Sequence, residues 1–369
     1  VDQPAAGTPM SAAALGEMTP LLEALRRACG SAPHSQFFEL ARQSYSQEST
    51  VGAAYVRMLR GLLEPLGIAV LDSSHVAVQT AARPILLEAL ASAKDIAEAT
   101  AKRAAAVREL GFEPQVEDDR GLSLVFAIEN GLKRRLTIAE AGQVAREGST
   151  ALLAPNVLLR PVVEREILPT VAYVAGPGEL AYFTQSDAVA MALGRDRLVA
   201  LPRWSGAIVE PLVERAMKRL GAGYEDWRDR PALERRLARA ALPENVSRAW
   251  KRLNEQVSAS VQELARAVQE SSLLPPAVIE GVSRALAHRL SRTERRLLAA
   301  VKRRDDAMRK DLACASAALW PRDKRQERVL NFIPMLARGG ESLLADVRSA
   351  AGDHARHLIG VRQKAPAGV

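Results

Sequence analysis

The chain has 369 residues, of which 48% are hydrophobic and 25% charged, so it holds enough apolar material for about two to three folded domains. Its two cysteines, Cys29 and Cys314, lie far apart in sequence, which excludes a disulfide framework and indicates no zinc site. This usage favours a reducing cytoplasm. The sequence contains no run of about 18 apolar residues and no signal-peptide pattern, so we expect no membrane span.

The formal charge of +8 is concentrated in one region of the chain. Residues 211–310 hold 22 Lys and Arg against 13 Asp and Glu, and the remainder is close to neutral. A basic helical region can bind nucleic acid. Here the charges lie between regularly spaced apolar residues, as on the solvated side of a helix, so nucleic-acid binding is the less favoured interpretation.

The first 110 residues predict helices and one short strand. Residues 1–18 are rich in Ala, Gly, Ser and Pro, and we expect a disordered lead. Helices are expected over 19–30, 50–66 and 83–110 from their capping residues and apolar spacing. The sequence GIAVLD at 67–72 predicts a buried strand. Helices that alternate with such strands are typical of an α/β fold.

Two further strands are expected to form a hairpin. The sequences LSLVFAIENG and LKRRLTIAEA alternate between apolar and polar residues on either side of Asn130-Gly131. Both Asn and Gly accept a positive φ, so this pair is a strong signal for a tight turn between antiparallel strands.

The stretch Ala151–Gln185 reads as an apolar strand that runs into the corner Gly176-Pro177-Gly178, with Glu179 where a helix begins. Such a corner aims unpaired backbone N–H groups at the strand end, which favours a phosphate or carboxylate. A tight turn without a ligand is the alternative interpretation. Arg160, before Pro161, is expected in an extended backbone that presents its guanidinium. A later strand ends at a second cation, Arg203.

From about residue 211 the apolar residues step by three and four, which predicts a coiled-coil seam. Its first half contains Val246, Trp250, Leu253, Val257, Val261, Leu264 and Val268, and its second half contains Ile279, Val282, Leu286, Leu290, Leu297, Val301, Met308 and Leu312. Because Pro275-Pro276 interrupts the seam, we expect an antiparallel hairpin of two long helices. Asp353-His354 and His357 have the i, i+3 spacing that could let two side chains share a metal. No third ligand lies nearby, so no metal site is predicted.

The residues resemble one known family, the BshC cysteine ligases of bacillithiol biosynthesis. The resemblance runs through NVLLRPVVEREILPTVAYVAGPGELAYF at 156–183, LPR at 201–203 and ERVLNFIPMLARGG at 327–340. Weaker agreement covers 67–74 and 122–136. The run from Asn-x-x-x-Arg-Pro to Gly-Pro-Gly-Glu-x-x-x-Tyr is far more specific than a lone glycine loop.

The resemblance implies an α/β fold, with a partial Rossmann-like core and an antiparallel coiled coil inserted before the C-terminal segment. It places the core at 19–210, the coiled coil at 211–318 and a helical segment that returns to the core at 319–369. It also implies a homodimer formed through the coiled coil. The implied activity joins cysteine to the amine of glucosaminyl malate.

The motif positions that match the family are the candidate site residues. Arg160 and Glu179 are the expected catalytic residues, and substrate binding is expected from Asn156, Gly176, Gly178, Tyr182 and Arg203. Arg160 and Arg203 are expected to hold anionic groups such as the malate carboxylates. Glu179 is expected to orient the amine or to cap the helix.

The chain departs from the family at its start, because it contains neither the family's phosphate-loop-like motif, which combines Gly-Gln-Gln, Gly-Leu and Gly-Pro, nor its Glu-x-His-Asp motif. We therefore expect it to correspond to the C-terminal portion of such a protein. Joining a carboxylate to an amine in water requires activation, which makes a nucleotide (ATP or ADP) one candidate, but no Walker loop is present and no cofactor is assigned from the sequence. The alternative is a non-catalytic coiled-coil dimerisation protein derived from a Rossmann-like enzyme.

Overall fold

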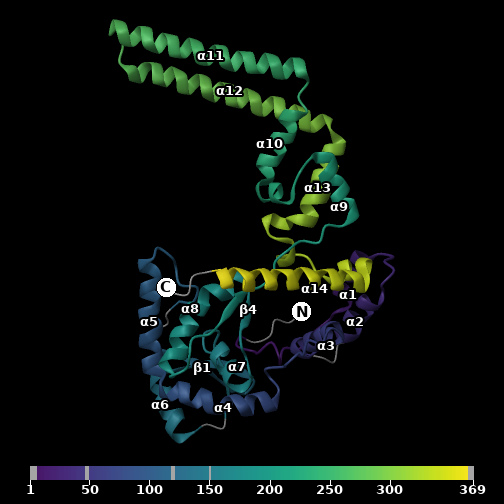
Figure 1. The fold of residues 1–369 in the computed structure, drawn as a ribbon, viewed down its shortest axis with the longest axis vertical. Coiled ribbons are helices and arrows are strands. Elements are labelled where there is room, and N and C mark those ends of the chain that lie inside the picture. Colours follow the sequence, from purple (N-terminus) through teal and green to yellow (C-terminus); the bar gives the residue numbers. More distant parts are fainter. Residues whose placement is uncertain (1–5, 46–49, 118–120, 149–150, 365–369) are drawn as a thin grey trace. The chain divides into compact units, whose positions relative to one another are not determined.

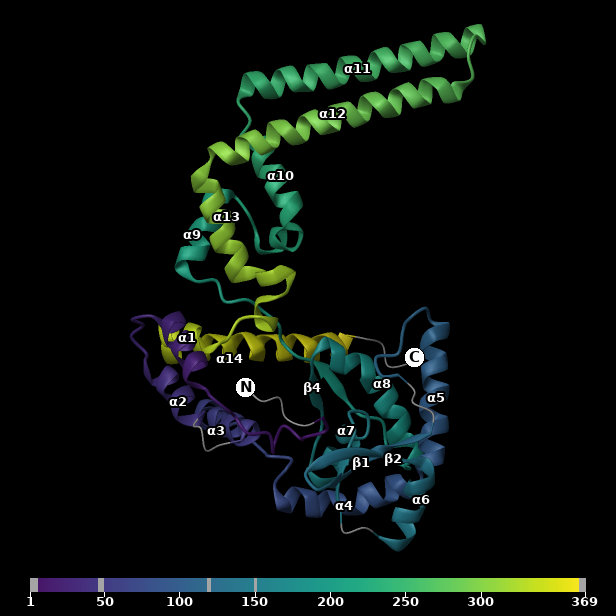
Figure 2. The ribbon, with the colours of Figure 1, turned by 180° about the vertical axis from the view of Figure 1, so that it is seen from behind.

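The computed structural model describes residues 6–45, 50–117, 121–148 and 151–364. The chain divides into two compact units (Figures 1 and 2). The first unit consists of Val1–Trp204 together with Phe332–Val369, and the second of Ser205–Asn331. Within the described residues, no helix is both long and apolar enough to cross a membrane.

The first unit contains helices from both ends of the chain. They are α1 (Thr19–Cys29), α2 (Gln36–Ser44), α3 (Val51–Leu63), the short η1 (Glu64–Leu66), α4 (Val76–Ala91), α5 (Ala93–Glu109), α6 (Ile138–Glu147), α7 (Arg160–Ile167), α8 (Pro177–Ala192) and α14 (Ile333–Lys364). Its strands are β1 (Leu122–Glu129), β2 (Leu132–Thr137), β3 (Leu152–Pro155), β4 (Tyr173–Ala175) and β5 (Ala200–Pro202).

The three-stranded sheet has the order β2-β1-β3, and both of its pairings are antiparallel. Glu129 pairs with Leu132 across a two-residue turn in which Asn130 and Gly131 have φ values of 52° and 77°. Two positive φ values match the right-handed twist of the flanking strands. The predicted hairpin is confirmed.

The second sheet holds the candidate site and consists of β4 and β5, which run parallel. The Tyr173 N–H donates to Val199 O and the Arg203 N–H to Ala175 O, both at 2.8 Å. Helix α8 connects the two strands, as a parallel pair requires. Strand, helix and parallel strand form the repeating unit of Rossmann-like folds.

The main core of the first unit lies between the sheets and the helices α4 to α8. Leu86, Val125, Leu159 and Val189 are at most 1% exposed, and they come from α4, β1, the start of α7 and α8. The same cluster contains Ala175 of β4, so it joins both sheets to the helices, and the hydrophobic core fixes the position of α7 and α8.

Helix α14 joins the C-terminal end of the described chain to this unit. It packs against α1 and α2 (Figures 1 and 2). At Gly340 the helix is broken by a φ of 63° and a ψ of −155°. A Cβ atom at Gly340 would lie 2.6 Å from His34 Cε1, so both the backbone and the space require glycine.

Three expectations for the first 110 residues differ from the structure. Residues 1–5 lie outside the described part, but residues 6–18 are not a loose lead, because Ala13 and Leu15 are buried and Ala14 pairs with Thr50. Residues 67–72 form no strand. Gly67 has a φ of 75° after η1, and Leu71 is 55% exposed.

The third difference is in the helix expected over 83–110, which is two helices. Helices α4 and α5 are separated at Ser92, whose φ of −94° and ψ of 15° end the first helix. Pro84 lies inside α4, where it neither begins the helix nor ends it.

The second unit is helical. It consists of α9 (Pro211–Leu220), η2 (Tyr224–Asp229), α10 (Arg230–Ala240), α11 (Glu244–Ser271), α12 (Pro276–Arg304), α13 (Asp306–Leu319), η3 (Pro321–Asp323) and η4 (Gln326–Arg328). Trp227 is 1% exposed in its core, and Leu319 is fully buried there. The Arg219 guanidinium joins α9 to α13 through two hydrogen bonds to Asp311, of 2.7 and 2.6 Å.

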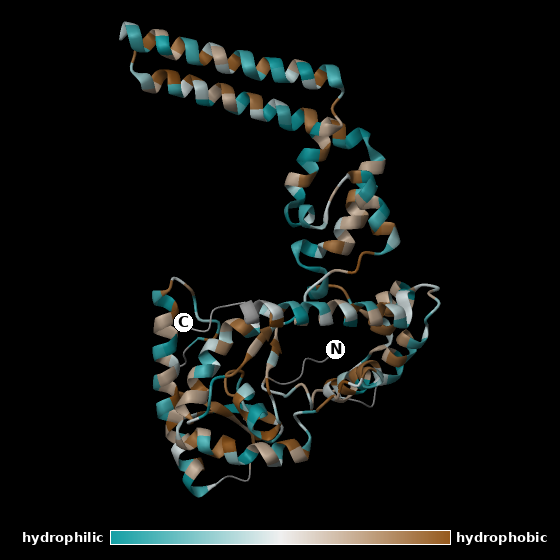
Figure 3. Ribbon diagram, viewed as in Figure 1, coloured by the Kyte–Doolittle hydropathy of each residue, from teal (hydrophilic) through white to brown (hydrophobic). Residues whose placement is uncertain are grey.

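Helices α11 and α12 lie side by side and are joined by the short turn 272–275 (Figures 1 and 2). Hydrophobic and hydrophilic residues alternate along both of them (Figure 3). The predicted seam is broken before its last two positions. Asp305 ends α12 and caps α13 by accepting the Met308 N–H at 2.8 Å. Met308 and Leu312 therefore pack in the core of this unit.

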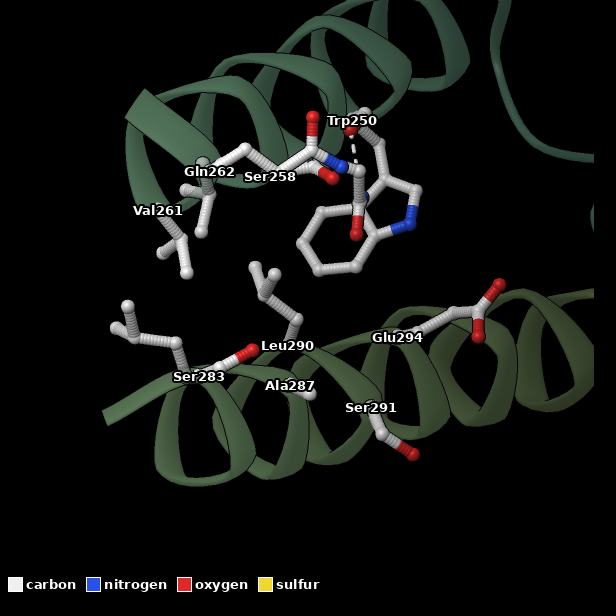
Figure 4. Close-up of a pocket in the computed structure, with 12 residues that line it drawn as sticks. Trp250, Ser258, Val261, Gln262, Ser283, Ala287, Leu290, Ser291 and Glu294 are labelled. Atoms are coloured by element: carbon white, nitrogen blue, oxygen red, sulfur yellow. Dashed lines mark hydrogen bonds between the residues drawn. The ribbon is translucent and has the colours of Figure 1, made fainter. Parts of the chain in front are cut away.

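A cavity of about 580 Å³ lies between α11 and α12 (Figure 4). Small side chains on facing turns, such as Ser258, Ser283 and Ala287, leave this space open below Trp250. Several seam residues stay half exposed, with 44% for Leu253 and 47% for Leu264. The two helices together thus bury only part of their apolar seam.

Candidate active site

The Gly-Pro-Gly-Glu corner connects the carboxyl end of β4 to α8, as the sequence predicts. Gly176 is the N-cap residue, and its N–H donates to Glu179 Oε2 at 2.8 Å. Pro177 lies in the first turn, where its missing N–H costs no helix hydrogen bond. The space beside Gly178 is open, because nothing lies within 4 Å of where a Cβ atom would be. The corner therefore presents an exposed helix N-terminus.

Helix α7 brings a cation to the side of α8. Arg160 Nη2 donates to the Tyr182 hydroxyl at 3.3 Å, and Arg160 Nε lies 3.7 Å from Glu164 Oε1 one turn along the helix. Arg160 is helical, so the expectation of an extended backbone before Pro161 is wrong. Proline is favoured in the first turn of a helix, and that preference prevails here.

Asn156 supports the start of α7 and does not itself contact Arg160 with its side chain. Its Oδ1 accepts the N–H groups of Leu158 and Leu159, each at 3.0 Å, and its carbonyl accepts the Arg160 N–H at 3.0 Å. Asn156 therefore fixes the direction in which α7 leaves β3. The stretch from 151 to 175 is a strand, a helix and a second strand, and the single apolar strand that the sequence suggests is wrong.

Tyr173 ties β4 to α7 below the corner. Its hydroxyl donates to Pro161 O, and its ring lies 5.4 Å from that of Phe183. Burial raises the pKa of Tyr173 to about 12, and the negative charge of Glu164 adds to this shift. The hydroxyl therefore stays protonated and acts as a hydrogen-bond donor.

We call Arg160, Glu164, Tyr173, Glu179 and Tyr182 the strand-end cluster. Burial raises the pKa of the Glu164 carboxyl, the Arg160 charge opposes this, and the Glu179 charge adds to it. Burial also raises the pKa of the Tyr182 hydroxyl, against the effect of Arg160. Two carboxylates, one guanidinium and two phenols thus interact beside β4, whose carboxyl end leads into the corner. The carboxyl ends of parallel strands are where α/β sheets place ligands.

Two basic side chains, one after β5 and one from α14, lie at the end of β5. Arg203 follows β5 directly, and its backbone N–H is bonded to Ala175, next to the corner. Its Nη1 donates to Trp204 O at 3.4 Å. His354 of α14 places Nε2 at 2.9 Å from Pro202 O, so the C-terminal helix also reaches this strand end.

The sequence alone did not place Glu164 or His354 at this site; it indicated His354 only as a candidate metal ligand with Asp353 and His357. Glu164 lies four residues after Arg160, a spacing that places both on one side of a helix, but that signal disappears if the segment is taken as a strand. The sequence gives no signal that His354 lies at β5, since only tertiary packing brings α14 there. Glu166 instead pairs with Arg195 at 3.4 Å, on the other side of α7.

Within the described residues, no group of three or more His, Cys, Asp and Glu side chains is arranged to hold a metal ion. Asp353 pairs with Arg356, and His354 with Pro202 O. The chemistry available at the strand ends is therefore that of cations, carboxylates and backbone N–H groups, which suits a substrate carrying carboxylates and an amine.

Two family models together match most of the chain. Residues 3–203 match the N-terminal Rossmann-like domain of bacillithiol biosynthesis BshC, and residues 206–359 match its C-terminal coiled-coil domain. The similarity to a Rossmann-like domain agrees with the β4–α8–β5 unit, although the sheets are small and most of the chain is helical.

Similar curated proteins carry the name "Putative cysteine ligase BshC". The protein from Solibacter usitatus is 28% identical over 321 residues, which cover 84% of this chain and 61% of the relative. That from Koribacter versatilis is 28% identical, covering 88% and 64%, and that from Thermus thermophilus is 29% identical, covering 82% and 65%. The chain thus spans less than two thirds of their length. On these matches, the chain belongs to the BshC family of bacillithiol biosynthesis.

Proposed function

We propose that the chain carries the substrate-binding part of a cysteine ligase, which joins the carboxyl group of cysteine to the amine of glucosaminyl malate in bacillithiol biosynthesis. The relatives bear the name of a cysteine ligase, so the non-catalytic alternative is not favoured. The observation that carries the proposal is the Arg160 guanidinium held by Tyr182 beside the Gly-Pro-Gly-Glu corner.

Arg160 and Arg203 hold the malate carboxylates in this proposal. A guanidinium matches a carboxylate with two parallel N–H donors, and such charge-assisted bonds are about twice as strong as neutral ones. Arg160 is 47% exposed in its side chain, so it can bind a substrate without losing the Tyr182 contact. The open N-terminus of α8 at Gly178 adds a second position for an anion.

Activation of the cysteine carboxylate calls for a nucleotide of the ATP class, because amide formation in water is uphill. The open N-terminus of α8 is the part of the described chain that we assign to its phosphates. Glu179 stabilises that helix end by accepting the Gly176 N–H, and in this proposal its role is to hold the corner.

The coiled coil supports a homodimer in the same proposal. Helices α11 and α12 form the antiparallel hairpin, and their half-exposed seam residues, Leu253 and Leu264 among them, would be buried against a second copy. The core at 19–210 and the segment 319–369 bind the substrates, while 211–318 joins the two copies. The free thiols of Cys29 and Cys314 agree with a cytoplasmic location.

The test is to incubate the 369-residue chain with cysteine, ATP and glucosaminyl malate and to measure the cysteine adduct by mass spectrometry. Arg160→Ala should lower kcat/KM by about 100-fold, the loss of roughly one well-placed charge-assisted bond. Arg165→Ala is the matched control on the same helix, because Arg165 donates to the carbonyls of Asp196 and Arg197 and not to Tyr182. Equal activity of Arg160→Ala and wild type would refute the assignment of this site.

A further inference from the structure

Glu164 has the most unusual setting among the carboxylates of the strand-end cluster. Its side chain is 36% exposed, and it lies on α7 near Arg160 and the partly buried ring of Tyr173. Within the described residues its carboxylate has one ionic partner, Arg160, at 3.7 Å, which is longer than a hydrogen bond. At least one oxygen of Glu164 is therefore available to a ligand.

Glu179, the other carboxylate of the cluster, is already engaged. Its Oε2 accepts the Gly176 N–H at 2.8 Å and completes the cap of α8. A protonated carboxyl group accepts a hydrogen bond more weakly than a carboxylate does. Protonation of Glu179 would therefore weaken its hydrogen bond from the Gly176 N–H. Glu164 has no such duty in the fold.

The groups that face Glu164 come from three elements. Arg160 is on its own helix, Glu179 and Tyr182 are on α8, and Tyr173 is on β4. Burial raises the pKa of Glu164, the charge of Arg160 opposes that shift, and the charge of Glu179 adds to it. A carboxylate with a raised pKa is a stronger base, and it is better suited to accept a proton near neutral pH.

We propose that Glu164 is the catalytic base, which takes the proton from the amine of the amino sugar before the amide bond forms. This role rests on the proposed cysteine ligase function. An amine beside electron-withdrawing oxygens, like an α-amino group with a pKa of about 8, is mostly protonated at neutral pH and has no electron pair to offer in that state. One proton passes from the ammonium nitrogen to an oxygen of Glu164, and the nitrogen pair then forms the bond to the activated carboxyl carbon of cysteine. The activating group leaves with the electrons of the bond that breaks, and the nitrogen gives its second proton to that leaving group, which completes the amide.

The pH dependence of Glu164→Gln tests this role, because the variant keeps the size of the side chain and loses the base. With the full chain, cysteine, ATP and glucosaminyl malate, kcat/KM should fall about 100-fold at pH 6.5. The deficit should shrink to about 10-fold or less at pH 9, where the substrate amine is already deprotonated. Glu164→Asp keeps a carboxylate and should retain the wild-type shape of the pH profile at a lower rate.

Two matched controls separate a base from a structural residue. Glu166→Gln lies on the same helix but faces Arg195, and it should stay within threefold of wild type. Glu179→Gln should lower thermal stability, and its loss of activity at pH 6.5 should stay far below that of Glu164→Gln, because it leaves the Glu164 carboxylate in place. A loss in Glu164→Gln that is equal at all pH values, an activity within threefold of wild type, or the same pH-dependent deficit in Glu179→Gln would each overturn the role of Glu164. A wild-type chain that forms no adduct would instead overturn the proposed function, and this role with it.

Discussion

The break in α14 at Gly340 permits a quantitative prediction. The residue has a φ of 63° and a ψ of −155°, a region that is essentially restricted to glycine and costs other residues about 1–3 kcal/mol. The added methyl group of Gly340→Ala would also lie 2.6 Å from the His34 ring. Overpacking of this kind costs about 1–3 kcal/mol. The variant should therefore lose about 2–6 kcal/mol of stability in the first unit.

Hydrogen exchange measured by mass spectrometry is the suitable assay, because a chain of two units need not unfold in one step. Peptides from α2 and α14 should exchange faster in Gly340→Ala. The double variant His34→Ala/Gly340→Ala removes the clash but keeps the backbone strain, so it should recover part of the protection that Gly340→Ala loses.

Gly352 supplies the matched control on the same helix. It has ordinary helical geometry, and a Cβ atom there would meet only the flexible end of Arg356, at 3.5 Å. Gly352→Ala should be neutral or stabilising by up to about 1 kcal/mol, as expected for alanine in a helix. If Gly340→Ala is as well protected from exchange as Gly352→Ala and wild type, the explanation that Gly340 must be glycine because of its backbone and its contact with His34 is wrong.

Two other predictions concern one bond at the candidate site and one in the second unit. Tyr182→Phe removes the hydroxyl that accepts from Arg160 at 3.3 Å, so we expect a stability change below about 1 kcal/mol and a roughly 3- to 10-fold rise in KM for glucosaminyl malate, with kcat little changed, by steady-state kinetics. The hydrogen bonds from Arg219 lower the pKa of Asp311 in the folded state. This pair therefore stabilises the protein fully above the pKa of Asp311 in the unfolded chain, about 4, and the stabilisation is lost as the pH falls through the folded-state pKa. In urea unfolding followed by tryptophan fluorescence, Asp311→Asn should cost at most about 1 kcal/mol near pH 7, and the difference from wild type should vanish at the lowest pH; a difference that persists there would contradict the ion-pair account.

Local signals in the sequence were sufficient for several elements. The Asn130-Gly131 turn, the helix start at Thr50 and the corner at Gly176 depend on backbone preferences within a few residues, and the structure has all three. Thr50, for example, accepts the Ala53 N–H at 3.2 Å as an N-cap residue. Such preferences act before any long-range packing and can be read from sequence.

Short apolar runs were misleading where tertiary context decides. GIAVLD at 67–72 has the composition of a strand, yet no neighbouring strand pairs with it among the described residues, and Leu71 is exposed. Arg160 reads as extended before proline, yet Asn156 and the first-turn position of Pro161 start a helix there. A run of four to six apolar residues fits either state, so packing selects between them.

The sequence by itself determined the family, the Gly-Pro-Gly-Glu corner and the identity of the cations at the strand ends, because each is carried by a contiguous motif. Only the tertiary structure placed Glu164 between Arg160 and Tyr173, and only it brought His354 to β5. These contacts join residues up to 152 positions apart in the chain. Burial and neighbouring charges, which set the basicity of a carboxylate, exist only after those distant segments have packed together.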